Sequence, residues 1–228
     1  MLISLCTPVM NRLDDLRQVM PARIAEANAS PPVELCILDC SSTDGLQDYM
    51  NELVRIARVA ADSYITYKRI DGITYYHQAK GYNAAMMLGG GEYLVTMGAD
   101  HIPNPGFIDA IREAVFDGHE WGYVDKTAII YCHRDDFIHI GGYDERFEFY
   151  GPEDKDIMRR LRMLLGAEAI LPRELISNID TPDSKKVANY RLPGTKHTFS
   201  EMMRKYYLEN IENNTLVVNM GKELGKWN

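Results

Sequence analysis

Cysteines are scarce in this chain, with four among 228 residues. Cys6, Cys36, Cys40 and Cys132 form no Cys-x-x-Cys pair, and three of them lie in or beside apolar runs. Cysteines of this kind are typical of buried free thiols in a reducing compartment. We therefore expect a cytoplasmic protein without a disulfide framework and without structural zinc.

Long apolar runs are missing as well. No segment approaches the roughly 20 apolar residues that a bilayer-spanning helix needs. The first six residues contain no basic region and already follow the pattern of a strand. We therefore expect no transmembrane segment and no signal peptide.

Basic residues are outnumbered, with 25 Lys and Arg against 33 Asp and Glu and a formal net charge of −8. A broad nucleic-acid footprint needs clustered Lys and Arg to neutralise phosphates. Nucleic acid is therefore a disfavoured partner, although a local basic groove is compatible with this balance. One or two cations and a metal can still hold a small anionic ligand.

The composition otherwise predicts an ordinary globular protein. Hydrophobic residues make up 46% of the chain and charged residues 25%, and 228 residues suffice for one sizeable core. No repeat or low-complexity tract marks a boundary. We expect one domain over residues 1–228.

Apolar runs typical of buried strands alternate with segments of helical periodicity. The predicted strands cover residues 2–6, 33–38, 64–69, 93–97, 123–131, 168–171 and 175–179. The predicted helices cover residues 11–28, 47–60, 78–88, 104–116, 152–165 and 198–213. We expect Pro21 to kink or split the first helix. The alternation predicts an α/β fold with a mostly parallel central sheet and helices on both faces.

Ligands of such sheets bind outside the carboxyl ends of the strands. Thr7-Pro8, Asp39-Cys40-Ser41 and Gly98-Ala99-Asp100 each follow a predicted strand. We therefore expect these three segments to converge on one crevice.

The richest cluster of candidate residues is GGYDERF at 141–147, followed by YGPED at 150–154. Asp154 falls in the first turn of the predicted helix 152–165, where unpaired backbone N–H groups and the helix dipole favour a carboxylate. An ionised carboxylate at the mouth of a pocket can take a proton from a hydroxyl. The plainer interpretation is a surface helix with acidic residues in its first turn.

These two segments resemble the GGxDExF…GxEDxDxxxRL signature of inverting glycosyltransferases of the GT-A type. The resemblance is closest to the large family 2 and to the galactosyltransferase C-terminal motif. It implies the Rossmann-like GT-A fold of nucleotide-diphospho-sugar transferases. It also implies that Asp154 is the catalytic base and that Glu153 holds an acceptor or donor hydroxyl.

Three further segments resemble motifs of the same family. TPVMNR at 7–12 is similar to TPxYNR, ILDCSSTDG at 37–45 to VDDGSTDGT, and AKGYNAA at 79–85 to ARNxG/AxxxA. Alternatively, Arg12 is a solvated arginine in a first helical turn, and Ser42 or Asp44 caps the next helix. The resemblance implies nucleotide-sugar binding by Thr7, Pro8, Asn11, Arg12, Asp39, Ser41, Lys80, Asn83, Gly98 and Ala99.

A metal is the cofactor that the resemblance implies, either Mn²⁺ or Mg²⁺. The family carries Asp-x-Asp where this chain has Gly98-Ala99-Asp100, so the first carboxylate is missing. A lone Asp100 can suffice, because these ions take much of their coordination from phosphate oxygens and water. The late histidine of the family is missing too, which leaves Asp180 or His197 as the last ligand.

On the acceptor side, the resemblance implies Trp121, Tyr143, Tyr150 and Gly151, although each aromatic residue also suits a core. Residues 1–100 would form the nucleotide-binding half, 101–180 the acceptor and catalytic half, and 181–228 a C-terminal loop and helix. The chain would move a sugar, with UDP-sugars the leading donors, to a hydroxyl of a carbohydrate or another acceptor. The alternative is a non-catalytic nucleotide-sugar-binding protein with a degenerate metal triplet. A sugar-nucleotide pyrophosphorylase is disfavoured because no GxGTR-like loop follows the first strand.

Overall fold

Four parallel strands form the first half of the sheet in the computed structural model, which describes residues 1–57 and 62–227. They are β1 (Ile3–Val9), β2 (Val33–Cys40), β3 (Tyr64–Ile70) and β4 (Tyr93–Thr96), in the spatial order β3-β2-β1-β4. Every residue of β1 and β2 is buried. Burial of this kind is typical of parallel strands that are covered on both faces.

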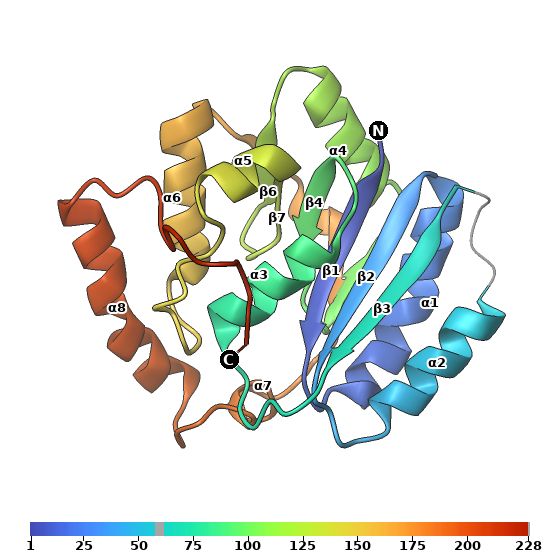
Figure 1. Cartoon of the computed structure of the whole chain (residues 1–228). Helices are drawn as coiled ribbons and strands as arrows, with labels where there is room; N and C mark the ends of the chain where they lie inside the picture. Colours follow the sequence, from blue (N-terminus) through green and yellow to red (C-terminus); the bar gives the residue numbers. More distant parts are fainter. Residues whose placement is uncertain (58–61, 228) are drawn as a thin grey trace.

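Helices cover both faces of this sheet, as Figure 1 shows for α1 (Leu13–Ala29) and α2 (Leu46–Ile56) on one side and α3 (Gln78–Leu88) on the other. Neighbouring residues of β1 point to opposite faces, so that Leu5 enters one apolar cluster and Cys6 the other. The first cluster also receives α4 (Phe107–Phe116). The second receives α5 (Arg134–His139) and α6 (Glu153–Leu165). The predicted α/β architecture is confirmed.

The second half of the sheet is mixed. β7 (Ile130–His133) pairs antiparallel with β4 and with β6 (Trp121–Val124), and β8 (Ala169–Leu171) runs parallel to β6. The single strand predicted over 123–131 is wrong. The chain reverses at Lys126, whose φ is 55°, and the Val124 N–H donates to the Ile129 carbonyl at 3.0 Å.

A small second sheet lies beside the main one. β5 (His101–Pro103) pairs antiparallel with β9 (Ile176–Asn178), and the Ile179 N–H donates to the Asp100 carbonyl at 2.9 Å. The remaining elements are a 3-10 turn (Arg173–Leu175), α7 (Asp183–Val187) and α8 (Lys196–Glu212). None of the helices among residues 1–57 and 62–227 has the length and apolar character to cross a membrane.

The first strand is longer than predicted, and Pro21 does not split the first helix. β1 continues through Thr7-Pro8 to Val9, because Pro8 lies beyond the last β1–β4 pair, where a proline is tolerated. α1 is one helix with Pro21 inside it, since Met20 before the proline and Ala27 after it both pack into the same apolar cluster. α2 ends at Ile56, and Ala60, the predicted end, lies outside the described residues.

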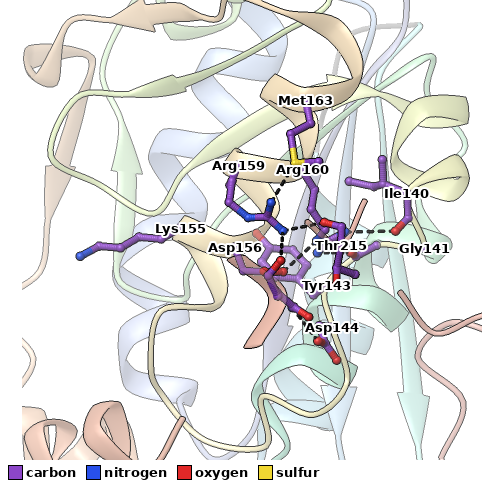
Figure 2. A network of polar contacts seen from close by, with 12 residues as sticks. Ile140, Gly141, Tyr143, Asp144, Lys155, Asp156, Arg159, Arg160, Met163 and Thr215 are labelled. Carbon is purple, nitrogen blue, oxygen red and sulfur yellow. Dashed lines mark hydrogen bonds and ion pairs between the residues drawn. The ribbon is translucent and has the colours of Figure 1, made fainter. Parts of the chain in front are cut away.

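Buried polar contacts fix α6 against the glycine turn before it, as Figure 2 shows. Arg160 is fully buried, and its Nε donates to Asp156 Oδ2 at 2.8 Å. Its Nη1 donates to the Ile140 carbonyl at 3.0 Å and its Nη2 to the Gly142 carbonyl at 2.7 Å. Asn210 of α8 donates to the second oxygen of Asp156 at 2.9 Å. The direction of α6 is therefore set before any ligand binds.

Candidate active site

A cavity of about 510 Å³ lies at the carboxyl ends of β1 and β4. The first turn of α6 and the segment from α7 to the start of α8 complete its wall. This is the edge of the sheet at which the sequence predicted a crevice. The predicted residues that line it are Pro8, Arg12, Gly98, Ala99, Asp100, Tyr150, Gly151, Glu153 and Asp154.

Two adjacent carboxylates stand at the α6 end of the cavity. Asp154 is half-buried, and its Oδ1 accepts a hydrogen bond from the Lys155 N–H at 2.8 Å. Glu153 is 5% exposed. Its two oxygens accept from Gln78 Nε2 at 2.9 Å and from the Gly151 N–H at 2.8 Å. Both carboxylate oxygens of Glu153 thus accept a hydrogen bond, whereas one oxygen of Asp154 does so.

Burial gives these two carboxylates higher pKa values than ordinary surface acids have. It raises the pKa of Glu153 to about 8, and the negative charge of Asp154 adds to this rise. Burial also raises the pKa of Asp154, against the opposite effect of the Lys155 N–H. The helix start therefore does not lower the pKa of Asp154 as the sequence suggested, because desolvation outweighs it. Burial thus favours retention of a proton by the pair, and Asp154, the more exposed of the two, is the carboxylate better placed to accept a proton from a ligand.

A cluster of opposite charges stands across the cavity. Lys186 Nζ lies 2.5 Å from Asp100 Oδ2, and Arg12 Nη2 lies 3.9 Å from the same oxygen. Burial raises the pKa of Asp100, but the surrounding charges, with Lys186 in direct contact, more than offset this and bring the pKa below its ordinary value. Asp100 is therefore an ionised carboxylate with a lysine partner.

Arg12 has a donor to spare. Its Nε pairs with Asp15 in the first turn of α1, which begins at the next residue. Its Nη2 is buried and has no hydrogen-bond acceptor among the described residues. A buried donor without an acceptor is costly unless a ligand completes it. The guanidinium therefore marks a place in the cavity for an anion.

Several residues predicted to bind the nucleotide lie outside the cavity lining and make hydrogen bonds that hold neighbouring loops. Asp39 is fully buried and accepts from Tyr67 Oη at 2.9 Å and from Arg69 Nη1 at 2.7 Å. Thr7 Oγ1 accepts from Arg23 Nη1 at 2.8 Å. Two more of these residues bond to the backbone of neighbouring turns. Asn11 Oδ1 accepts from the Thr43 N–H, and Ser41 Oγ donates to the Ile70 carbonyl.

Four further predicted residues also lie away from the cavity wall. Asn83 is buried and exchanges hydrogen bonds with the backbone of Tyr143, which is itself 1% exposed. Trp121 is fully buried, and its Nε1 donates to the Gly166 carbonyl at 3.1 Å. Lys80 lies over the ring of Trp227 near the C-terminus, at 6.0 Å from its centroid. Asn83 thus fixes the glycine turn before α6, and Trp121 and Tyr143 belong to the core.

The structure adds cavity residues that the motifs did not indicate. Tyr190 donates its hydroxyl proton to Gln78 Oε1 at 2.7 Å, and Gln78 in turn contacts Glu153. Tyr82 lies one helical turn after Gln78 on α3, so both residues share one face of the helix. This spacing could have indicated Tyr82 from the sequence. No motif in the sequence indicated Lys186 or Tyr190, because these residues reach the cavity only where the chain after β9 folds back over it. The added residues include Tyr76, Gln78, Tyr82, Lys186, Asn189 and Tyr190.

Comparisons with known proteins agree with the fold. The family model described as "N-terminal domain of galactosyltransferase" matches residues 110–180. The structure of S. aureus TarS 1-349 in complex with UDP-GlcNAc aligns with a TM-score of 0.69 and 12% identity, over 98% of this chain and 68% of TarS 1-349. No curated protein matches the chain in sequence.

Two further solved structures are similar in fold. Glucosyl-3-phosphoglycerate synthase from Mycobacterium tuberculosis, in complex with Mn²⁺, UDP and its product, aligns with a TM-score of 0.62 and 13% identity, over 97% of this chain and 82% of that one. The mannosyltransferase PcManGT from Pyrobaculum calidifontis, with GDP-Man and Mn²⁺, aligns with a TM-score of 0.61 and 15% identity, over 94% and 71%.

The chain has a GT-A fold. It is shorter than some of these neighbours, since it spans 54% of one TarS 1-349 structure and 44% of a longer TarS structure. The fold places the carboxyl ends of β1 and β4 and the start of α6 around one cavity, whereas Asp39-Cys40-Ser41, which was also expected at this crevice, lies outside its lining.

At the predicted metal place, the described residues of this GT-A chain offer only Asp100 to a divalent cation, and Asp100 already has a lysine partner. No three His, Cys, Asp or Glu side chains stand together as a metal group within residues 1–57 and 62–227. Asp100 is paired with Lys186, and His101 Nδ1 accepts from the Gly98 N–H at 3.0 Å. Asp180 and His197 are exposed and lie outside the cavity lining. The cation that Asp100 contacts in this chain is an ammonium group.

Proposed function

We propose that the chain transfers a sugar from a nucleotide-diphospho-sugar to an acceptor hydroxyl, with inversion at the anomeric carbon. One observation carries this proposal. Within a GT-A fold, a half-buried carboxylate, Asp154, lines the same cavity as the cationic side chains of Arg12 and Lys186. The cavity thus offers a proton acceptor on one side and charge for a diphosphate on the other.

The reaction requires three changes of bonding. The acceptor oxygen forms a bond to the anomeric carbon, the bond between that carbon and the diphosphate oxygen breaks, and the hydroxyl proton passes to Asp154. The nucleoside diphosphate leaves with the bonding electrons. Arg12 and Lys186 are placed to stabilise its growing negative charge, which is a large contribution to catalysis in a partly buried site. Glu153 accepts hydrogen bonds from Gln78 and from the Gly151 N–H, and so orients both groups.

A UDP-sugar is the first donor to test. Two of the neighbours described above hold UDP or UDP-GlcNAc, and the third holds GDP-Man. Residues 1–100 supply Arg12 and Asp100, so we assign the donor to this half of the chain. The half that spans 101–180 supplies Glu153 and Asp154 and faces the acceptor.

Aromatic side chains suggest the class of acceptor. Tyr76, Tyr82, Tyr150 and Tyr190 all line the cavity. A tyrosine presents an apolar ring and a hydroxyl together, which suits the faces and hydroxyls of a sugar. A carbohydrate hydroxyl is therefore the acceptor that this wall favours.

The proposal is tested by release of nucleoside diphosphate from UDP-glucose, UDP-galactose, UDP-GlcNAc and GDP-mannose, with water as the acceptor. The assays run both with Mn²⁺ and with EDTA. At least one donor should release its diphosphate, and the freed sugar should be the β-anomer when read by NMR before it mutarotates. An α-anomer would contradict inversion. Nucleotide binding without release from any donor would favour the non-catalytic binding protein instead.

The role of Asp154 has a matched control. Asp154→Asn should lower donor turnover by roughly 10²–10⁴-fold, because a general base contributes about this much, while nucleotide binding persists. Asp135→Asn changes an exposed acid that is also in the first turn of a helix, α5, and should leave turnover unchanged. Equal turnover in Asp154→Asn and the control would exclude Asp154 as the base.

A further inference from the structure

We propose that Lys186 and Arg12 bind the donor diphosphate directly, so that the nucleotide binds without a divalent cation. This inference rests on the proposed function, because it assumes a nucleotide-diphospho-sugar as the donor. It differs from the resemblance, which implied Mn²⁺ or Mg²⁺ at Asp100. Four observations support it.

The first is the ion pair itself. Lys186 Nζ contacts Asp100 Oδ2 at 2.5 Å, with the two side chains 24% and 11% exposed. A metal ion at this carboxylate would have to displace the ammonium group or stand beside it, and two like charges at one partly buried carboxylate repel strongly. Lysine carries three donors, so the same ammonium can contact Asp100 and a phosphate oxygen together.

The second is the unused donor of Arg12. Its Nη2 is buried, has no hydrogen-bond acceptor among the described residues, and lies 3.9 Å from Asp100 Oδ2. An acceptor oxygen between Arg12 and Lys186 would satisfy this donor. A diphosphate offers several such oxygens, and arginine binds phosphate well because its planar N–H groups match the geometry of the anion.

The third is the charge of the cavity wall. The whole chain has a formal net charge of −8. The wall, by contrast, has more cationic than acidic side chains, and burial raises the pKa of one of its acids, Glu153, to about 8. An excess of positive charge inside a cavity concentrates anions there. The cationic residues of the wall are Arg12, Lys126, Lys155, Lys186 and Lys196, and the acidic ones are Asp100, Glu153 and Asp154.

The fourth is the way the segment around Lys186 is fastened. Asn189 Nδ2 donates to the Met10 carbonyl at 2.9 Å, and Asn189 Oδ1 accepts from Asn11 Nδ2 at 2.8 Å. Lys185 contacts Asp15 Oδ1 at 3.3 Å. These contacts tie α7 to the loop after β1 and to α1 before any ligand binds. Preorganised charges of this kind lower the cost of ordering the site when the diphosphate arrives.

The test is isothermal titration calorimetry with UDP, GDP, CDP and dTDP, each in EDTA and in Mn²⁺. The wild-type protein should bind at least one nucleotide in EDTA, with a Kd that changes less than about threefold in Mn²⁺. Lys186→Met should raise that Kd at least about tenfold, since a charged hydrogen bond to phosphate is lost. Lys222→Met changes an exposed lysine that does not line the cavity, and should leave the Kd within about twofold.

Each outcome decides between the two proposals. Binding that requires Mn²⁺ and disappears in EDTA would overturn this inference and leave the proposed function standing. A Kd in Lys186→Met equal to that of Lys222→Met would overturn it as well. If Lys186→Met does not fold, Arg12→Met is expected to weaken binding in EDTA and takes its place. Absence of binding by the wild type to all four nucleotides in both buffers would contradict the proposed function itself.

Discussion

Lys186 reaches across the cavity and places its ammonium group 2.5 Å from Asp100 Oδ2. Asp100 follows β4, whereas Lys186 lies on α7, after the sheet is complete. Both side chains line the cavity that also contains Asp154. The pair therefore joins the donor side of the site to the segment that closes it, and it decides how much positive charge a diphosphate would meet.

Asp100→Asn should affect nucleotide binding in opposite ways, depending on whether Lys186 and Arg12 or a metal ion at Asp100 binds the diphosphate. If lysine and arginine bind the diphosphate, removal of a nearby carboxylate should lower the Kd for UDP in EDTA, by about threefold or more, because like charges repel at close range. If Asp100 holds a metal, the same change should abolish binding in Mn²⁺. Calorimetry on the variant separates these results.

Asp109→Asn is the matched control for the Asp100 variant. Asp109 is 58% exposed on α4 and does not line the cavity. It removes the same charge from the chain without changing the site. An equal shift in both variants would mean that the net charge, and not the Lys186–Asp100 pair, controls nucleotide affinity.

Glu153 should make the free energy of unfolding depend on pH. Burial raises its pKa in the folded state from 4.5 to about 8, so the folded protein binds this proton more tightly than the unfolded chain does. The wild type should therefore lose stability relative to Glu153→Gln as pH rises from about 4.5 to about 8. A rise of one pH unit within this window costs up to about 1.4 kcal/mol.

Urea unfolding of both proteins from pH 4.5 to pH 8.5 measures this difference. The advantage of Glu153→Gln should be smallest at pH 4.5 and largest above pH 8. Glu174→Gln, a change of an exposed glutamate, should show no such trend relative to the wild type. A constant difference between Glu153→Gln and the wild type over the whole range would show that Glu153 titrates normally.

Arg160 should be among the most stabilising polar residues of the chain. It and Asp156 are both fully buried, and it also donates to two carbonyls of the turn at 140–142. Arg160→Met leaves Asp156 buried without its cation, which costs about 3–5 kcal/mol. Chemical denaturation followed by circular dichroism measures the loss.

Arg204→Met is the surface control for Arg160. Arg204 is 62% exposed on α8 and pairs with Glu201 at 3.9 Å, so its loss should cost less than about 0.5 kcal/mol. Should Arg160→Met fail to fold, Asn210→Ala removes a neighbouring contact to Asp156 for about 1–3 kcal/mol. A loss below about 1 kcal/mol in Arg160→Met would mean that an apolar side chain replaces the buried ion pair.

The local pattern of the chain was enough to predict the first half of the sheet and its helices. Residues 33–38 are apolar at nearly every position, and β2 runs from Val33 to Cys40. The hairpin between β6 and β7 was not predictable in this way. Its turn at Lys126 carries no glycine or proline, and the apolar run at 128–132 continues the pattern of one strand.

The sequence by itself determined the GT-A arrangement of its elements and the place of the Glu153–Asp154 pair at the start of α6, because short-range periodicity and motif order encode both. Only the tertiary structure decided which charges face this pair. It buried Asp39 beside Arg69, placed Trp121 in the core and brought Lys186 next to Asp100. Burial and the pairing of distant charges depend on tertiary contacts between segments that are far apart in the sequence, and local sequence patterns do not encode these contacts.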